Sequence, residues 1–230
     1  MKPLRSLLLA FLVVGTAGAV APQTLMDAGD YARAYEAAQT QGDPLGASEA
    51  AAAQLSYRAP GERAWAERAV AAGREATRQR PDTAGAHLAL GQALGLQAQL
   101  GGYSLRALAQ AKEARRELER ALELDPALHR ARMALGYWHA VGWAKAGRLS
   151  GADRNEALRL TAQALGAAAL DLRLSVQAGQ AYAALKDARA VEVLRRALTL
   201  SAKTALERDA QAQARALLAR NMARSGPATP

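Results

Sequence analysis

Alanines recur at a fixed interval in four segments of the chain. The pairs are Ala69 and Ala76, Ala114 and Ala121, Ala157 and Ala164, and Ala190 and Ala197. Seven residues make two turns of an α-helix, so each pair lies on one face, where a neighbouring helix can approach closely. Gly, Pro and Asp residues separate these segments from others of the same kind. The pattern predicts helices over residues 24–40 (interrupted at Gly29), 43–58, 61–80, 83–100, 103–124, 127–145, 153–169, 171–185, 187–200 and 203–224.

The helical segments form repeating units. The first alanines of the four pairs are 45, 43 and 33 residues apart, and the last interval is close to the about 34 residues of a tetratricopeptide repeat (TPR). "ARRELERALELDP", which ends at Pro126, resembles the second helix of that repeat. "AHLALGQAL", "ARMALGYWH" and "SVQAGQAY" resemble the first helix, with Gly91, Gly136 and Ala178 in its small-residue position.

Residues 24–222 therefore resemble the TPR family. The resemblance implies an all-α fold, a right-handed superhelix (α-solenoid) of antiparallel helical hairpins. The enlarged units, with "ALELDP" followed by "ALGYWH", also resemble more weakly the repeat proteins related to the regulator of microtubule dynamics family. We carry no activity over from that second resemblance.

Two of the units contain insertions. From the small residue to the first alanine of the second helix is 12 residues in the last unit, but 23 and 21 in two earlier units. The additional residues fall between the two helices of a hairpin, near 95–106 and 143–153, and extend the same edge of the stack. Insertions on one face of a repeat array often form its binding face, so Tyr103, Ser104 and Arg148 are candidate contacts. The alternative is lengthened helices with neutral loops.

The resemblance also implies a concave surface built from the first helices, where a peptide or a helix can bind. Residues spaced by three and four on two of these helices are the candidates for that groove. The alternative is that each is ordinary packing or unused surface. Lys is absent from these positions, although some TPR proteins grip acidic peptide termini with it. The candidates are Arg130, Met133, Tyr137, Ser175, Gly179 and Tyr182.

The N-terminus resembles a secretory signal peptide. Lys2 and Arg5 precede an apolar run from Leu7 to Val14, and small residues follow at a potential cleavage site after Ala19. We expect an exported protein, periplasmic or extracellular, with no transmembrane segment after cleavage. The alternative is an uncleaved N-terminal anchor. The sequence contains no Cys, so export would not bring disulfides.

Composition and charge agree with an interaction protein. Ile is absent, the only Phe is Phe11, and strong helix formers dominate. The net charge of +9 becomes +7 without residues 1–19, which favours acidic partners. The basic residues are scattered among acidic ones, so nucleic-acid binding is not expected.

We find no catalytic or metal-binding motif. His87, His129 and His139 are too far apart along the helices to form a metal-binding pair, and no Cys or acidic cluster accompanies them. His139 occupies a position that the TPR family usually fills with a core aromatic, so we expect it to be packed. We therefore expect no metal, no cofactor and no enzyme activity.

The expected organisation follows from these observations. A signal peptide (1–19) precedes a partial repeat (20–42), TPR-like repeats (43–201), a C-terminal capping helix (202–224) and a disordered tail (225–230). The expected function is an exported, non-catalytic scaffold that binds a protein or peptide through its concave surface, with acidic partners favoured by the net charge. The alternatives are an envelope assembly factor that binds a small ligand, or an unrecognised hydrolase. The oligomeric state is not predicted.

Overall fold

The computed structural model describes residues 20–224, and within this range the secondary structure is entirely helical. Every helix begins and ends within two residues of its predicted range. The expected signal peptide and tail lie outside the described residues. No helix within 20–224 is long and apolar enough to cross a membrane. The elements are α1 (Pro22–Ala28), α2 (Tyr31–Thr40), α3 (Pro44–Tyr57), α4 (Arg63–Gln79), α5 (Ala84–Leu100), α6 (Leu105–Leu124), α7 (His129–Ala146), the 3-10 turn η1 (Gly147–Ser150), α8 (Arg154–Ala167), α9 (Leu172–Ala184), α10 (Arg189–Thr199) and α11 (Ala205–Arg224).

Short polar side chains begin several of the helices. Asp43, Ser104, Asp153 and Asp171 each accept a hydrogen bond from the backbone N–H three residues later, at 2.9–3.1 Å. Such caps satisfy N–H groups that have no partner inside the helix. Gly29 ends α1 with φ +86°, a conformation that side chains other than glycine rarely adopt, so the predicted interruption is confirmed.

Small residues set the spacing within each hairpin. All eight alanines of the repeated pairs are buried. A methyl group added to Gly91 would lie 2.8 Å from Leu118 Cγ, and one added to Gly136 would lie 2.8 Å from Thr161 Oγ1. The two helices of these hairpins therefore approach each other along glycine and alanine faces, as the predicted small-residue position requires.

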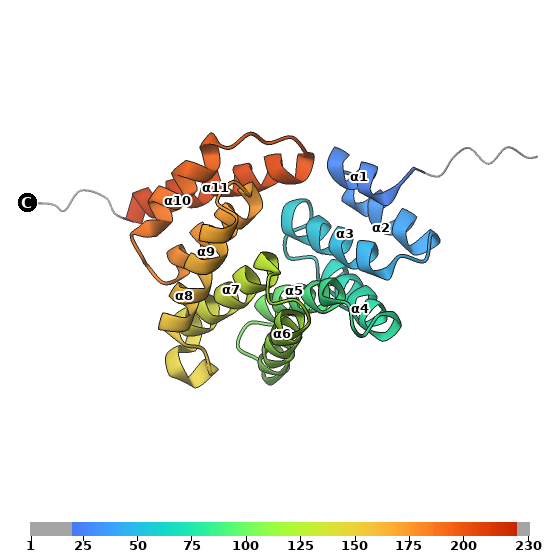
Figure 1. Cartoon of the computed structure of the whole chain (residues 1–230), viewed down its shortest axis with the longest axis horizontal. Helices are drawn as coiled ribbons and strands as arrows, with labels where there is room; N and C mark the ends of the chain where they lie inside the picture. The colour runs from blue at the N-terminus through green and yellow to red at the C-terminus, as the bar shows by residue number, and fades with distance from the viewer. Residues whose placement is uncertain (1–19, 225–230) are drawn as a thin grey trace, which may run out of the picture.

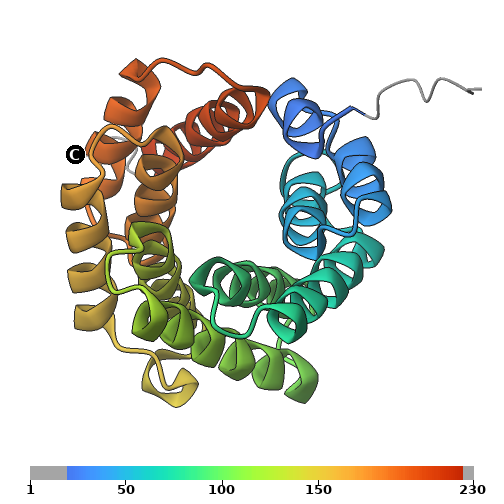
Figure 2. The ribbon, with the colours of Figure 1, turned by 45° about the vertical axis from the view of Figure 1, so that its right-hand side comes forward.

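The hairpins stack in chain order and curl around a common axis (Figure 1). Successive helices pack on each other, and α3, α5, α7 and α9 form the inner layer. The stack does not end in an open superhelix. A loop of residues 200–204 carries the chain across the remaining gap, and α11 begins beside α1 (Figure 2). The described residues thus form a closed ring.

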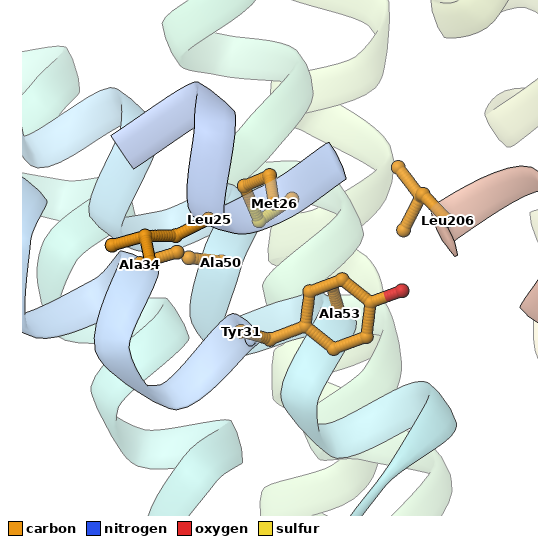
Figure 3. Close-up of a cluster of buried hydrophobic side chains, with 7 residues drawn as sticks. All are labelled: Leu25, Met26, Tyr31, Ala34, Ala50, Ala53 and Leu206. Atoms are coloured by element: carbon orange, nitrogen blue, oxygen red, sulfur yellow. The ribbon is translucent and has the colours of Figure 1, made fainter. Parts of the chain in front are cut away.

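An apolar cluster closes the ring, and we call the contact of α1–α3 with α11 the seam. Leu25 and Met26 of α1 and Tyr31 of α2 pack with Leu206, which comes from the first turn of α11 (Figure 3). Ala34, Ala50 and Ala53 complete the cluster. A methyl group added to Gly29 would lie 2.9 Å from the Ala205 methyl, so the two backbones are in close contact here.

Polar contacts accompany this cluster. The Tyr31 hydroxyl donates a hydrogen bond to Asp209 Oδ2 at 2.5 Å. Arg58 Nη1 donates to the other oxygen of the same carboxylate at 2.8 Å, and the Arg58 guanidinium lies 5.1 Å from the centre of the Tyr31 ring. α11 packs on α9 and α10, as a capping helix would. It also contacts α1, so it joins the first and the last helices of the stack.

Candidate functional site

The ring encloses a cavity of about 720 Å³. Its walls come from one face of each inner helix, from α6 and from the first half of α11. The lining extends from the first turn of α7, at Arg130, to its last turn, at Lys145. The cavity therefore runs along the whole length of α7, and we call it the channel.

The middle of the channel carries no charged side chain. Small and apolar residues alternate there with glutamine side chains from three helices. Gln180 and Gln213 are hydrogen-bonded to each other at 3.1 Å, across the α9–α11 contact. A primary amide has two donors and an acceptor, so these side chains offer both kinds of hydrogen bond to a bound molecule. The glutamines are Gln92, Gln99, Gln177, Gln180 and Gln213.

The charged lining residues gather at the two ends of the channel. Arg130 Nη2 of α7 lies 3.3 Å from Glu49 Oε1 of α3, and Asp171 and Arg173 at the start of α9 line the same end. Both members of the Arg130–Glu49 pair are about two-fifths exposed, so the pair contributes little to stability. Because the pair is weak and partly exposed, the side chains of Arg130 and Glu49 can exchange partners and contact a ligand.

Two of the six predicted groove residues line the channel and four do not. Arg130 and Tyr137 face it, and burial raises the pKa of the Tyr137 hydroxyl, partly opposed by a hydrogen bond with Gln99. Met133, Ser175 and Tyr182 are buried, and their placement in the groove is wrong.

The residues that were wrongly placed in the groove pack between repeats instead. Met133 and Tyr182 belong to one apolar cluster with residues of α8, α9 and α10. A spacing of three and four residues selects one side of a helix, but it does not say whether that side faces the channel or the next hairpin. Gly179 is also buried. It faces α10, because a methyl group added to it would lie 2.5 Å from Leu194 Cδ2.

The two insertions border one end of the channel. Tyr103 and Ser104 line it, whereas Arg148 is exposed outside the lining. Ser104 also caps α6 by accepting the Ala107 N–H at 3.1 Å, so its hydroxyl has a structural role. The structure therefore places both insertions on the same edge of the ring.

The channel glutamines were missed by the sequence analysis. Gln92 and Gln99 are seven residues apart, and Gln177 and Gln180 are three apart, so each pair shares a face of its helix. A polar residue repeated on one face of an otherwise apolar helix was the available signal. Gln213 could not be found in this way, because its approach to the channel depends on ring closure.

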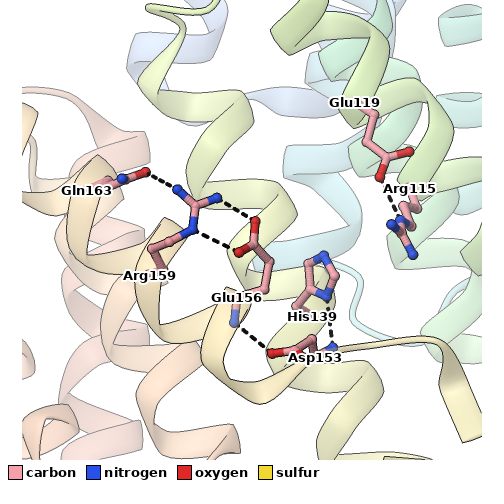
Figure 4. A network of polar contacts seen from close by, with 7 residues as sticks. All are labelled: Arg115, Glu119, His139, Asp153, Glu156, Arg159 and Gln163. Atoms are coloured by element: carbon pink, nitrogen blue, oxygen red, sulfur yellow. Dashed lines mark hydrogen bonds and ion pairs between the residues drawn. The ribbon is translucent and has the colours of Figure 1, made fainter. Parts of the chain in front are cut away.

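His139 of α7 lies in a polar network at the start of α8 (Figure 4). Its Nδ1 accepts the Asp153 N–H at 3.0 Å, while the Asp153 carboxylate caps α8. Burial lowers the pKa of His139, and the nearby charge of Arg115 lowers it further. The carboxylates of Glu119 and Glu156 are paired with arginines. The imidazole is thus a neutral, buried acceptor that fixes the start of α8.

The described residues contain no group of three or more His, Asp or Glu side chains placed to hold a metal ion. The ionisable groups near His139 form pairs with one another and line a shallow hollow of about 590 Å³. None of them is arranged beside a hydroxyl that it could activate as a nucleophile.

One solved structure supports the fold. A thermophilic TPR protein of Thermus thermophilus is similar to this chain with a TM-score of 0.61 and 17% identity, covering 86% of this chain and 100% of that protein. No protein-family model matches the sequence, and no curated protein matches it. Together with the helical hairpins, the similarity shows a TPR-like, all-α repeat fold. The predicted fold class is confirmed.

Proposed function

We propose that this protein is an exported, non-catalytic scaffold that binds an extended segment of a partner polypeptide inside the channel. The observation that carries the proposal is the set of glutamine amides that face the uncharged middle of the channel from α5, α9 and α11. Amide side chains pair with peptide N–H and C=O groups irrespective of sequence, while the small apolar residues between them accommodate side chains.

The dimensions of the channel suit such a ligand. α7 has 18 residues, which corresponds to a length of roughly 27 Å. An extended chain spans that length with about eight residues. Lys112 and Lys145 at one end of the channel favour a segment with acidic residues near that end. At the other end Arg130 and Arg173 are accompanied by Glu49 and Asp171, so both signs of charge are available there.

Filling the channel tests the proposal. A methyl group at Gly95, which lines the channel, would have no neighbour within 4 Å, so Gly95→Trp places an indole in open space. Gly166→Trp is the matched control, because Gly166 also lies in a helix with open space around it but on the exposed surface of α8. Binding to a fluorescent pool of acidic octapeptides should be lost only in Gly95→Trp. Equal binding by both variants would contradict the proposal.

A small ligand is the second candidate, and the volume of the cavity favours it. About 720 Å³ lies within the roughly 300–1,000 Å³ of small-molecule sites. A thermal-shift screen of uncharged small molecules against the same two glycine variants distinguishes the candidates. A stabilising compound that fails only on Gly95→Trp, without any peptide binding, would support the small-ligand function instead.

Export has a separate test. If residues 1–19 act as a cleaved signal peptide, mass spectrometry of the protein from its native cells should find a mature N-terminus at Val20. A chain that still carries residues 1–19 would support the uncleaved anchor.

A further inference from the structure

Exposed apolar side chains are concentrated where the two insertions meet. Tyr103 and Leu105 are each 87% exposed, Leu149 is 94% exposed and Leu108 is 41% exposed. Three large apolar side chains with comparable exposure lie elsewhere in residues 20–224, and they are far apart in the sequence. We call the four side chains, together with Arg106, Lys112, Lys145 and Arg148, the insertion rim.

The two halves of the rim are adjacent in space. The chain reverses between α6 and α7, and Trp138 Nε1 donates a hydrogen bond to the Ala111 carbonyl at 2.7 Å. Residues that precede Ala111 on α6 therefore lie beside residues that follow Trp138 on α7. Arg115 also donates to the Gly151 carbonyl at 3.3 Å, which ties the second insertion to α6.

The rim carries an excess of basic residues. The segments 100–112 and 142–152 contain four Lys and Arg residues and no Asp or Glu. None of these four cations forms an ion pair within the described structure, whereas Arg74, Arg78, Arg120 and Arg159 on the outer helices are all paired with carboxylates. The rim therefore carries four positive charges without ion pairs beside its apolar side chains. One of them, Arg148, interacts with the Asp153 carboxylate, whose pKa is lowered by the backbone hydrogen bond that caps α8 and further by the charge of Arg148.

We propose that the insertion rim docks the protein onto an anionic membrane surface. The apolar side chains project from loop tips and the first turns of a helix, and Tyr103, Leu105 and Leu149 are almost completely exposed to solvent. Projecting Tyr and Leu side chains suit the boundary between lipid headgroups and acyl chains, and Lys and Arg beside them bind anionic headgroups.

Docking through the rim does not depend on which ligand the channel binds, but it would determine from which side a ligand can enter the channel. Tyr103, Leu108 and Leu149 also line one end of the channel. Docking through the rim would therefore turn that end of the channel toward the bilayer. The other end, with Arg130 and Arg173, would face the solvent.

A site-specific fluorescent probe tests the docking. The chain has no Cys, so Leu149→Cys carries a single environment-sensitive label in the full-length protein. Leu170→Cys is the matched control, because Leu170 is 80% exposed and apolar but lies outside the rim, between α8 and α9. Because the signal is local, membrane contact by residues 1–19 does not by itself shift either label.

We expect a blue shift of the Leu149 label on phosphatidylglycerol vesicles, none on phosphatidylcholine vesicles, and none for the Leu170 label on either. Adding Lys145→Ser and Arg148→Ser should weaken the apparent affinity by at least about tenfold, since each basic residue near an anionic surface contributes about fivefold. A Leu149 label that stays solvent-exposed on anionic vesicles would overturn the proposal. A shift that appears without vesicles as protein concentration rises would also overturn it, because the rim would then be a contact between two copies.

Discussion

The interfaces inside the stack and the seam that closes the ring are built from different residues. Between α5 and α6 the contact depends on Gly91, Ala114 and Ala121, which let two backbones approach. The seam also has one close approach, of Gly29 to Ala205, but it adds a feature that the α5–α6 contact lacks, one carboxylate, Asp209, shared by Tyr31 and Arg58.

The difference shows how a repeat array can become a ring. Each hairpin interface joins helices that are neighbours in the sequence, so little chain entropy opposes it. The Tyr31–Asp209 contact joins residues 178 positions apart, and it becomes possible only after the repeats have stacked. We infer that hairpin interfaces determine whether the protein folds, and that the seam determines whether the folded stack is open or closed.

The largest loss of folding stability is expected from a substitution at a hairpin interface. In Gly179→Val the added side chain would collide with the fully buried Leu194, because even a methyl group there lies 2.5 Å from Leu194 Cδ2. Overpacking of this kind costs about 3 kcal/mol, measured as the free energy of unfolding in urea. Gly166→Val, at an exposed helical position with open space, is the control and should be close to wild type. Equal stability of the two variants would show that hairpin spacing is not critical.

A smaller loss of stability, accompanied by opening of the ring, is expected from a substitution at the seam. Asp209→Ala leaves the buried Tyr31 hydroxyl and the Arg58 guanidinium without their partner, which costs about 2 kcal/mol. Small-angle X-ray scattering should show a larger radius of gyration with unchanged helical circular dichroism. Glu75→Ala, which breaks an exposed pair on α4, should change neither quantity. A radius as in wild type would mean that the polar contacts do not hold the ring closed.

Alkaline pH should weaken the seam. Burial raises the pKa of Tyr31, and the hydrogen bond to Asp209 raises it further. A raised pKa means that the contribution is complete below the unfolded value of about 10 and is lost as pH rises above it. At pH 7, Tyr31→Phe should cost about 1.5 kcal/mol relative to wild type. In urea titrations this difference should shrink above pH 10, and a constant difference would refute the linkage.

Acidic pH should weaken the α7–α8 interface, and we expect this change in stability to be the smallest of the four. The pKa of His139 is lowered by burial and by Arg115, so its contribution is present above the unfolded value of about 6.5 and is lost as pH falls below it. Between pH 7 and 5 the wild type should lose more of its free energy of unfolding than His139→Gln, measured in urea titrations. Parallel pH profiles for the two proteins would exclude His139 as a titrating group.

Local signals predicted the repeats well because the determinants are close in sequence. Asp43, Asp153 and Gly29 set helix ends through contacts within a few residues, and the paired alanines mark buried faces. The site was predicted only in part. Arg130 and Tyr137 were placed in the channel, but the helical spacing could not separate them from Met133, Ser175 and Tyr182, which face neighbouring hairpins.

Ring closure could not be read from the sequence. Leu206 and Asp209 belong to a helix that has the composition of an ordinary cap, and their partners on α1 and α2 lie more than 170 residues away. Nothing in the repeat pattern relates these positions, because the seam is made once and not in every unit. The enclosed channel, and the role of Gln213 in it, follow from that single contact.

The most direct test of the account is the distance across the seam in solution. Spin labels at Ala28→Cys, next to Gly29, and at Arg208→Cys, one turn beyond Ala205, report it without interference, because the chain has no other Cys. Pulsed electron paramagnetic resonance should give one short, narrow distance in the otherwise wild-type protein. The same pair with Asp209→Ala should give a longer, broader distribution. A long or broad distribution without Asp209→Ala would show that the repeats form an open superhelix and would contradict the closed ring.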